Sequence, residues 1–231
     1  MKIQKAAEME MNSLKVLLYG APGTGKTYCL RTLPKPILVF DFDKGMLTNK
    51  GIDGVEYVVY NADNPKDPNV YREFQKDLIA TDGYPCIAID SLSGLNEAVI
   101  NYCMKLQGKP TKSPTMQDWG VIGAAMSQLM NVFRSLPPIV VITAHSRSER
   151  NDQTGGIKTW PSVTGNVRYS IGKYFDEMYI TTKRRDKLGK TEYVFDTQGD
   201  NNHPAKSRLS ASVPFERYIL PDFKELLQKG G

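Results

Sequence analysis

The chain is poor in the side chains that most often bind transition metals or form nucleophile–base pairs. Its 231 residues include two histidines, His145 and His203, and three cysteines that lie far apart without metal-ligand spacing, Cys29, Cys86 and Cys103. A zinc site or a Ser-His-Asp hydrolase therefore has few residues to draw on. We expect the cysteines to be reduced thiols in a hydrophobic core.

Long apolar runs are also missing. No stretch approaches the roughly 20 apolar residues that cross a bilayer. Residues 1–13 are polar, mixed in charge and without the apolar segment of a secretory signal. These absences predict a cytoplasmic protein without a membrane partner. The net charge of +5 permits an anionic partner without requiring one.

Short apolar runs alternate with helical patterns through most of the chain, which predicts an α/β fold with a largely parallel sheet. The strand-like runs are residues 14–19, 37–41, 55–60, 86–90 and 139–144. Helical spacing appears at Val70, Phe74 and Leu78. A longer helical stripe, which we expect to pack in the core, follows the capping-box pair Thr115 and Asp118 and comprises Trp119, Ile122, Met126, Leu129, Met130 and Phe133.

The sequence becomes more polar after residue 144. Residues 146–165 are polar, and we expect a long loop that is either functional or disordered. A strand at 178–182 leads into basic residues, and Gly189 predicts a β-hairpin that returns through 193–195. We see no domain boundary. The expectation is a single domain over residues 1–231, with a core of about 14–208 and a C-terminal tail at 214–231.

Residues 20–27 match the phosphate-binding pattern G-x-x-x-x-G-K-[ST] and follow an apolar strand. Glycines let several backbone N–H groups point at phosphate oxygens, and the following helix offers its N-terminal dipole. The alternative, a glycine-rich turn that happens to precede a lysine, leaves Thr27 and the strand–helix context unexplained. The pattern predicts ATP and Mg²⁺ as ligands, with contacts from Gly20, Ala21, Pro22, Gly23, Thr24, Gly25, Lys26, Thr27 and Tyr28.

Two carboxylates follow predicted strands at the edge of the sheet where ligands bind. Asp90 is expected to hold Mg²⁺ together with the Thr27 hydroxyl. Asp90 and Ser91 could instead cap a helix, and both roles are compatible. Asp43 is our candidate for orienting the water that attacks the γ-phosphate. The alternative is a solvated loop carboxylate paired with Lys44.

The order of these motifs resembles the RecA-like ATPase core. In detail the chain is similar to a phage-encoded AAA-type P-loop nucleotide-binding family that includes small single-strand annealing recombinases. The resemblance implies a RecA-like P-loop NTPase fold with a mostly parallel central sheet and flanking helices. It is carried by residues 20–27, Asp90-Ser91-Leu92, Asp118-Trp119-Gly120, Thr143-Ala144-His145, Phe175-Asp176-Glu177 and Ala205-Lys206-Ser207-Arg208.

The resemblance also implies roles for individual residues. His145 stands where RecA-like proteins carry a polar sensor of the γ-phosphate, although an ordinary strand-end histidine is the alternative. Residues 146–163 stand at a mobile DNA-binding loop, with a disordered surface loop as the alternative. The residues there that suit phosphates and bases are Arg147, Arg150, Lys158 and Trp160.

Lys206 and Arg208 resemble the basic pair that RecA-like oligomers insert into a neighbour's ATP site, where an arginine stabilises the transferring phosphoryl group. The alternative is a basic surface turn. The chain departs from RecA at Asp43, where RecA has glutamate. The shorter side chain reaches less far, so we expect slow hydrolysis.

The function implied by the resemblance is ATP hydrolysis in phage DNA recombination or repair, in the host cytoplasm. An ATP·Mg-dependent homo-oligomer would bind single-stranded DNA and promote annealing, with a single-strand-binding protein as a further partner. The predicted hairpin adds Lys183, Arg184 and Arg185 to the DNA contacts. Two alternatives remain open: a small-molecule P-loop phosphotransferase, and a DNA-binding module switched by ATP without hydrolysis.

Overall fold

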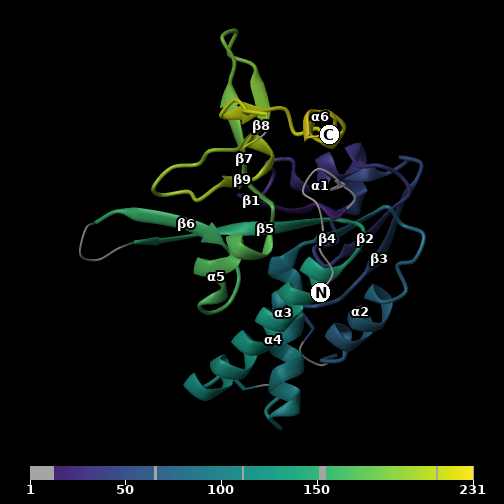
Figure 1. The fold of residues 1–231 in the computed structure, drawn as a ribbon. Helices are drawn as coiled ribbons and strands as arrows, with labels where there is room; N and C mark the ends of the chain where they lie inside the picture. Colours follow the sequence, from purple (N-terminus) through teal and green to yellow (C-terminus); the bar gives the residue numbers. More distant parts are fainter. Residues whose placement is uncertain (1–12, 65–66, 111, 151–154, 212, 231) are drawn as a thin grey trace, which may run out of the picture.

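A central β-sheet organises the computed structural model, which describes residues 13–64, 67–110, 112–150, 155–211 and 213–230. Its strand order is β10-β8-β7-β1-β5-β4-β2-β3 (Figure 1). The strands from β7 to β3 in that order are parallel to one another. The expected α/β class with a mostly parallel sheet is therefore confirmed. The parallel strands are β1 (Lys15–Gly20), β2 (Ile37–Asp41), β3 (Val55–Val59), β4 (Cys86–Asp90), β5 (Ile139–Arg150) and β7 (Glu177–Arg185).

The antiparallel strands lie at one edge of the sheet and beside β5. β7 continues through a turn into β8, which carries β10 at the edge. β9 pairs with β7, and β6 pairs with β5. These strands are β6 (Ile157–Pro161), β8 (Thr191–Asp196), β9 (Lys206–Ser207) and β10 (Tyr218–Ile219).

Helices cover both faces of the sheet, so its central strands are apolar on both sides. β1 and β4 are buried at every residue, as expected for parallel strands between two helical layers. On one face lie α2 (Val70–Leu78), α3 (Leu92–Leu106), α4 (Met116–Ser135) and α5 (Val167–Ser170); on the other lie α1 (Lys26–Cys29) and α6 (Phe223–Gly230) (Figure 1). Short 3₁₀ helices span Leu30–Thr32, Met46–Asn49, Ile171–Tyr174 and Leu209–Ala211.

Alternate residues of the same strands supply the two cores. Leu17 of β1 packs under α2 to α5, whereas Val16 and Leu18 pack under α1 and α6. The three cysteines are free and buried in these cores, as expected from their spacing. No helix in the described ranges combines the length and apolar character needed to cross a lipid bilayer.

α4 begins and ends where the sequence predicts. Thr115 and Asp118 form the capping box, and the helix stops at Ser135 before two prolines. The rest of the predicted stripe is buried, but Trp119 is 38% exposed, so its assignment to the core is wrong. The indole lies at the end of the stripe, beyond the cover of neighbouring elements.

The expected loop at 146–165 is also wrong at residues 146–150 and 157–161, while residues 151–154 lie outside the described residues. β5 continues six residues past Ala144 and pairs with β6 in an antiparallel hairpin, in which Arg147 opposes Trp160. This β5–β6 hairpin projects from the body of the molecule (Figure 1). The predicted hairpin around Gly189 is confirmed and is called the β7–β8 hairpin.

Candidate nucleotide-binding site

The loop between β1 and α1 owes its shape to three glycines. Gly23 and Gly25 have φ values of 72° and 90°, a left-handed region that favours glycine. A glycine is needed at Gly20 for a different reason, because a Cβ there would lie 2.4 Å from the backbone oxygen and the hydroxyl of Thr181 on β7. Thr24 hydrogen-bonds to the same Thr181 hydroxyl at 2.6 Å. The loop is thus fixed against the sheet.

Lys26 lies buried at the start of α1, with its ammonium inside the loop. Its Nζ donates to the carbonyl oxygens of Gly20 and Ala21, each at 2.9 Å. Burial lowers the pKa of Lys26, while Asp90 and Asp43 work against that shift. An ammonium has three donors. In the described part of the chain two are used, so one is left for a phosphate oxygen.

Thr27 and Asp90 meet directly below this loop. The Thr27 hydroxyl donates to Asp90 Oδ2 at 2.7 Å, and the Thr143 hydroxyl of β5 donates to the other carboxylate oxygen. Asp90 is 2% exposed. Burial raises its pKa, although the hydrogen bonds from Thr143 and Thr27 oppose the shift. The carboxylate is thus held in place from both sides.

This donor set fits Mg²⁺. A hydroxyl and a carboxylate are hard oxygen ligands, and Mg²⁺ in nucleotide sites is usually held by one or two such groups plus phosphates and waters. No cluster of three acidic, histidine or cysteine side chains suited to a metal occurs among the described residues. Gly45 leaves room beside it, since a Cβ there would lie 3.4 Å from both Asp90 Oδ2 and Thr27 Oγ1.

Ser91, next to the metal candidate, caps α3. Its hydroxyl accepts a hydrogen bond from the Gly94 amide at 3.3 Å. The same hydroxyl donates to Asp43 Oδ1 at 2.9 Å. The side chain therefore joins the helix cap to the neighbouring carboxylate.

Asp43, just after β2, and His145, within β5, form a pair. His145 Nε2 lies 2.9 Å from Asp43 Oδ2. Burial alone would raise the pKa of Asp43, but hydrogen bonds from His145 and Ser91 outweigh it and hold the pKa below its usual value. Lys44 instead contacts Asn61 and Asp63. The structure therefore places Asp43 with His145 and not with Lys44.

A cavity of about 800 Å³ opens over these groups, within the range of small-molecule sites. It brings together the loop, both carboxylates and His145. Its remaining wall includes Tyr193 of β8 and Leu220, which sequence patterns missed. The full lining is Pro22, Gly23, Gly25, Lys26, Thr27, Tyr28, Asp43, Thr48, Asp90, His145, Glu192, Tyr193, Leu220 and Pro221. We call it the nucleotide cavity.

Tyr193 lies close enough to the loop to restrict it. A Cβ on Gly25 would lie 3.4 Å from the Tyr193 ring. No motif marks Tyr193 or Leu220, because both reach the loop only through the pairing of β8 with β7 and β10. A sequence pattern read along the chain has no access to such a contact.

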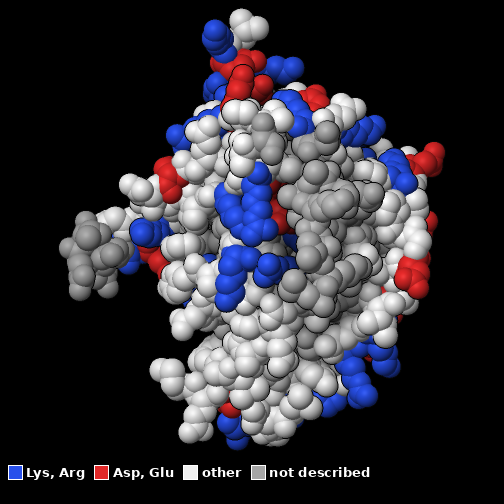
Figure 2. All heavy atoms as spheres, viewed as in Figure 1, with Lys and Arg blue, Asp and Glu red and all other residues white. Residues whose placement is uncertain are grey.

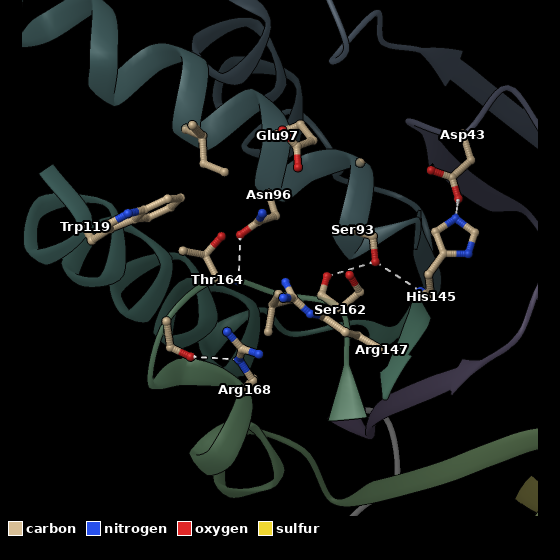
Figure 3. Close-up of a pocket in the computed structure, with 14 residues that line it drawn as sticks. Asp43, Ser93, Asn96, Glu97, Trp119, His145, Arg147, Ser162, Thr164 and Arg168 are labelled. Atoms are coloured by element: carbon tan, nitrogen blue, oxygen red, sulfur yellow. Dashed lines mark hydrogen bonds and ion pairs between the residues drawn. The ribbon is translucent and has the colours of Figure 1, made fainter. Parts of the chain in front are cut away.

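A second cavity of about 660 Å³ lies on the other side of the Asp43–His145 pair and shares both residues (Figure 3). We call it the lateral cavity. Ser93 of α3 fixes the boundary: its hydroxyl accepts from the His145 amide at 3.0 Å and donates to the Ser162 carbonyl at 3.0 Å. The pair thus stands between two open spaces.

The residues of the β5–β6 hairpin that are predicted to contact DNA differ in their exposure and in their neighbours. Arg147 lies 3.7 Å from Glu149 and is exposed, and Arg150 and Lys158 are exposed as well. Trp160 packs edge-on against Tyr169, with ring centroids 5.3 Å apart. The structure therefore brings three cations and one half-buried aromatic ring to the hairpin.

The β7–β8 hairpin carries the remaining predicted cations. Lys183 lies over the Tyr193 ring, Arg184 pairs with Glu192 at 2.6 Å, and Arg185 donates to the Gly189 carbonyl at 2.7 Å. Figure 2 shows basic side chains around this projecting hairpin and near the middle of the viewed face, with acidic ones interspersed. Lys183 also lies near the loop, 3.7 Å from where a Gly23 Cβ would be.

Lys206 and Arg208 do not line the nucleotide cavity of their own chain. Lys206 Nζ donates to the carbonyls of Gly172 and Phe175 at 2.9 and 2.7 Å, and burial lowers its pKa. Arg208 is half-exposed and contacts Asp176 at 2.5 Å. Lys206 therefore holds a turn together within the chain, while the Arg208 guanidinium keeps an exposed side.

Comparisons with known proteins give one family match and several similar folds. Residues 12–209 match the family model AAA_24, described as an AAA domain. No curated protein matches the chain. The flagellar accessory protein FlaH from Methanocaldococcus jannaschii is similar in structure, with 12% identity over 90% of this chain and 84% of that one and a TM-score of 0.44.

Two further solved structures show similar values. For the RadB recombinase the identity is 13%, covering 80% of this chain and 88% of that one, with a TM-score of 0.42. For a KaiC-like protein from Pyrococcus horikoshii OT3 the identity is 12%, covering 84% of each chain, with a TM-score of 0.45. Such likenesses concern the fold alone.

Proposed function

The chain belongs to the AAA_24 family of AAA domains, and from that premise we propose that it is an ATP-hydrolysing enzyme that acts on single-stranded DNA. The observation that carries the proposal is the convergence of Lys26, Thr27, Asp90 and Asp43 on one cavity. A cation, a hydroxyl and two carboxylates around a phosphate-binding loop are the groups that phosphoryl transfer requires.

Each of these groups has a distinct task. Lys26 neutralises charge on the β- and γ-phosphates. Thr27 and Asp90 would hold Mg²⁺, which would offset the negative charge that develops on the phosphates. Asp43 accepts a hydrogen bond from the attacking water and orients it. Its carboxylate is ionised at neutral pH because its pKa lies below the usual value.

His145 connects this chemistry to the rest of the molecule. Its ring contacts Asp43 at one end of the nucleotide cavity, and its strand continues into the β5–β6 hairpin. A change at the γ-phosphate that moves Asp43 therefore acts on the strand that carries Arg147. This link supports a sensor role for His145.

DNA binding rests on the two projecting hairpins. The exposed cations of the β5–β6 hairpin are Arg147, Arg150 and Lys158, and the β7–β8 hairpin adds Lys183, Arg184 and Arg185. Contacts to phosphates release counterions, so affinity should fall with salt. Annealing of complementary strands in recombination is the biological role that we propose for this binding.

A homo-oligomer is part of the proposal, with Arg208 supplied to a neighbour's nucleotide cavity. The side of Arg208 that remains exposed supports this role better than Lys206, whose ammonium is committed to two carbonyls. Arg208→Ala should slow hydrolysis without unfolding the chain. Mixing it with Lys26→Ala should restore part of the activity. Absence of rescue in co-assembled proteins would count against the trans role.

The decisive experiment measures phosphate release with and without single-stranded DNA over a series of salt concentrations. We expect Mg²⁺-dependent turnover that DNA stimulates and salt suppresses. Equal turnover with and without single-stranded DNA would show that DNA is not the activator. Binding of ATP without turnover would favour the alternative of a switched DNA-binding module.

A further inference from the structure

We propose that the lateral cavity holds one unstacked base of single-stranded DNA and prefers bases with an exocyclic amino group. The proposal rests on the DNA-dependent function proposed above and assigns a base-reading site to it. Trp119 lies at one end of the cavity and the Asp43–His145 pair at the other (Figure 3). Asn96, Glu97 and Arg147 lie between these ends.

The charges of the lining suit a neutral ring better than a phosphate. Arg168 has a side chain only 16% exposed, and it is tied to Glu149 and to the Gly165 carbonyl. Arg147, in contrast, has a side chain that is 64% exposed. Arg168 is therefore not free to bind a phosphate, whereas the exposed Arg147 of the lining is available for the backbone phosphate of the same nucleotide.

Trp119 supplies the surface on which a base would stack. It is the half-exposed member of a helical stripe whose other members are buried. Its indole has no ring partner, cation or hydrogen bond in the part of the chain that the structure describes. Stacking on aromatic side chains is the usual way in which proteins hold single-stranded bases.

Glu97 and Asn96 supply a polar edge. The Glu97 side chain is exposed, and its carboxylate has no hydrogen bond or ion pair to any described residue. The buried Asn96 side chain accepts from the Thr164 amide at 3.1 Å, which orients it and leaves its NH₂ group without a described partner. A carboxylate beside an amide donor matches an amino group next to a ring nitrogen, as on adenine or cytosine.

Thymine lacks that amino group, which gives the proposal a clear test. Binding of labelled dC, dA and dT oligonucleotides of equal length would be measured by fluorescence anisotropy at one salt concentration. We expect the native protein to bind dC and dA several-fold more tightly than dT. Glu97→Gln should reduce this preference, because the neutral amide has one acceptor oxygen in place of two and loses the charge that strengthens the hydrogen bond.

Trp119→Ala should weaken binding of all three oligonucleotides by about tenfold, and Trp119→Phe should restore most of the loss. Tyr57→Ala, which removes an exposed aromatic ring on β3 away from the cavity, is the control. An oligonucleotide carrying 2-aminopurine gives a second readout, because stacking on Trp119 should quench its fluorescence. Thermal unfolding of each variant would confirm that it remains folded.

The outcomes separate the base site from the proposed function. Native DNA binding that neither Trp119→Ala nor Glu97→Gln alters would overturn the base site and leave the DNA-dependent ATPase intact. No DNA binding by the native protein would overturn both. A preference for dT over dC and dA would also reject the assigned base class.

Discussion

The nucleotide cavity and the two projecting hairpins differ in how their charged groups are held. Around the cavity, Asp90 receives hydrogen bonds from two hydroxyls and Lys26 donates to two carbonyls. On the β7–β8 hairpin, Lys183 and Arg185 make single contacts at the surface. Buried polar groups must be satisfied, whereas exposed charges remain solvated.

This difference bears on the two functions that we propose, ATP hydrolysis at the nucleotide cavity and DNA binding on the hairpins. The cavity is preorganised, so loss of one group leaves its partners unpaired and has a large effect. We expect each exposed hairpin cation to contribute only a small part of the free energy of DNA binding, because the attraction is the sum over all of them.

Lys26→Ala should nearly abolish nucleotide binding and turnover. The variant loses the cation on the phosphates together with two hydrogen bonds that close the loop. We expect affinity to fall on the order of a hundredfold or more, measured by titration with a fluorescent nucleotide. Circular dichroism should show an unchanged fold. Native affinity in the variant would refute the assigned phosphate site.

Asp43→Asn should slow phosphate release by about a hundredfold or more while nucleotide affinity changes little, because the water-orienting acceptor is lost. Ser91→Ala, which removes a hydrogen-bond donor to Asp43 together with the cap of α3, should slow phosphate release less. Steady-state turnover and nucleotide titration separate the two quantities. Equal loss of affinity and turnover would place Asp43 in ground-state binding instead.

Replacing Arg185 and Lys187 together with alanine should weaken single-stranded DNA binding a few-fold. The slope of log affinity against log salt should fall by about one for each lost phosphate contact. Anisotropy titrations over a salt series measure both values. The exposed Lys50, away from the hairpins, provides a matched Lys50→Ala control. An unchanged slope would remove this hairpin from the DNA-binding surface.

Asp118→Asn should lower the melting temperature modestly at neutral pH. Backbone and side-chain hydrogen bonds from Thr115 lower the pKa of Asp118 from 3.8 to about 2. The ionised carboxylate therefore stabilises the fold above the ordinary pKa, and this stabilisation is lost as the pH falls toward about 2.

The gap in melting temperature between Asp118→Asn and the native chain should consequently close over that acidic interval. The exposed loop variant Asp82→Asn serves as the control and should show no such gap. A difference that persists at low pH would show that the effect comes from packing and not from the ionised cap.

The strands and the phosphate loop were predictable because their signals are local. The runs at β2 and β4 match the observed bounds, since buried parallel strands read as continuous apolar segments. The phosphate loop needs glycine at Gly23 and Gly25 for its backbone alone. The backbone conformation of the loop is therefore specified by residues that are close together in the sequence.

The missed features depend on contacts between distant segments. The polar strand β6 has no continuous apolar face, so its pairing with β5 leaves no clear periodicity. α3 is an exception: Leu92, Leu95 and Val99 recur at helical spacing and are buried, yet only the possible helix cap at Asp90 and Ser91 was predicted. Tyr193 reaches the phosphate loop only through sheet pairing, which no local pattern reveals.

β5 has a consequence for communication across the molecule, because it is one uninterrupted strand from the core to the hairpin. It runs from Ile139 to Arg150, and His145 lies near its middle. The five residues beyond His145 span about 17 Å at 3.3 Å each. A small tilt of the strand at the nucleotide cavity would therefore displace Arg150 more than His145, because Arg150 lies farther along the strand.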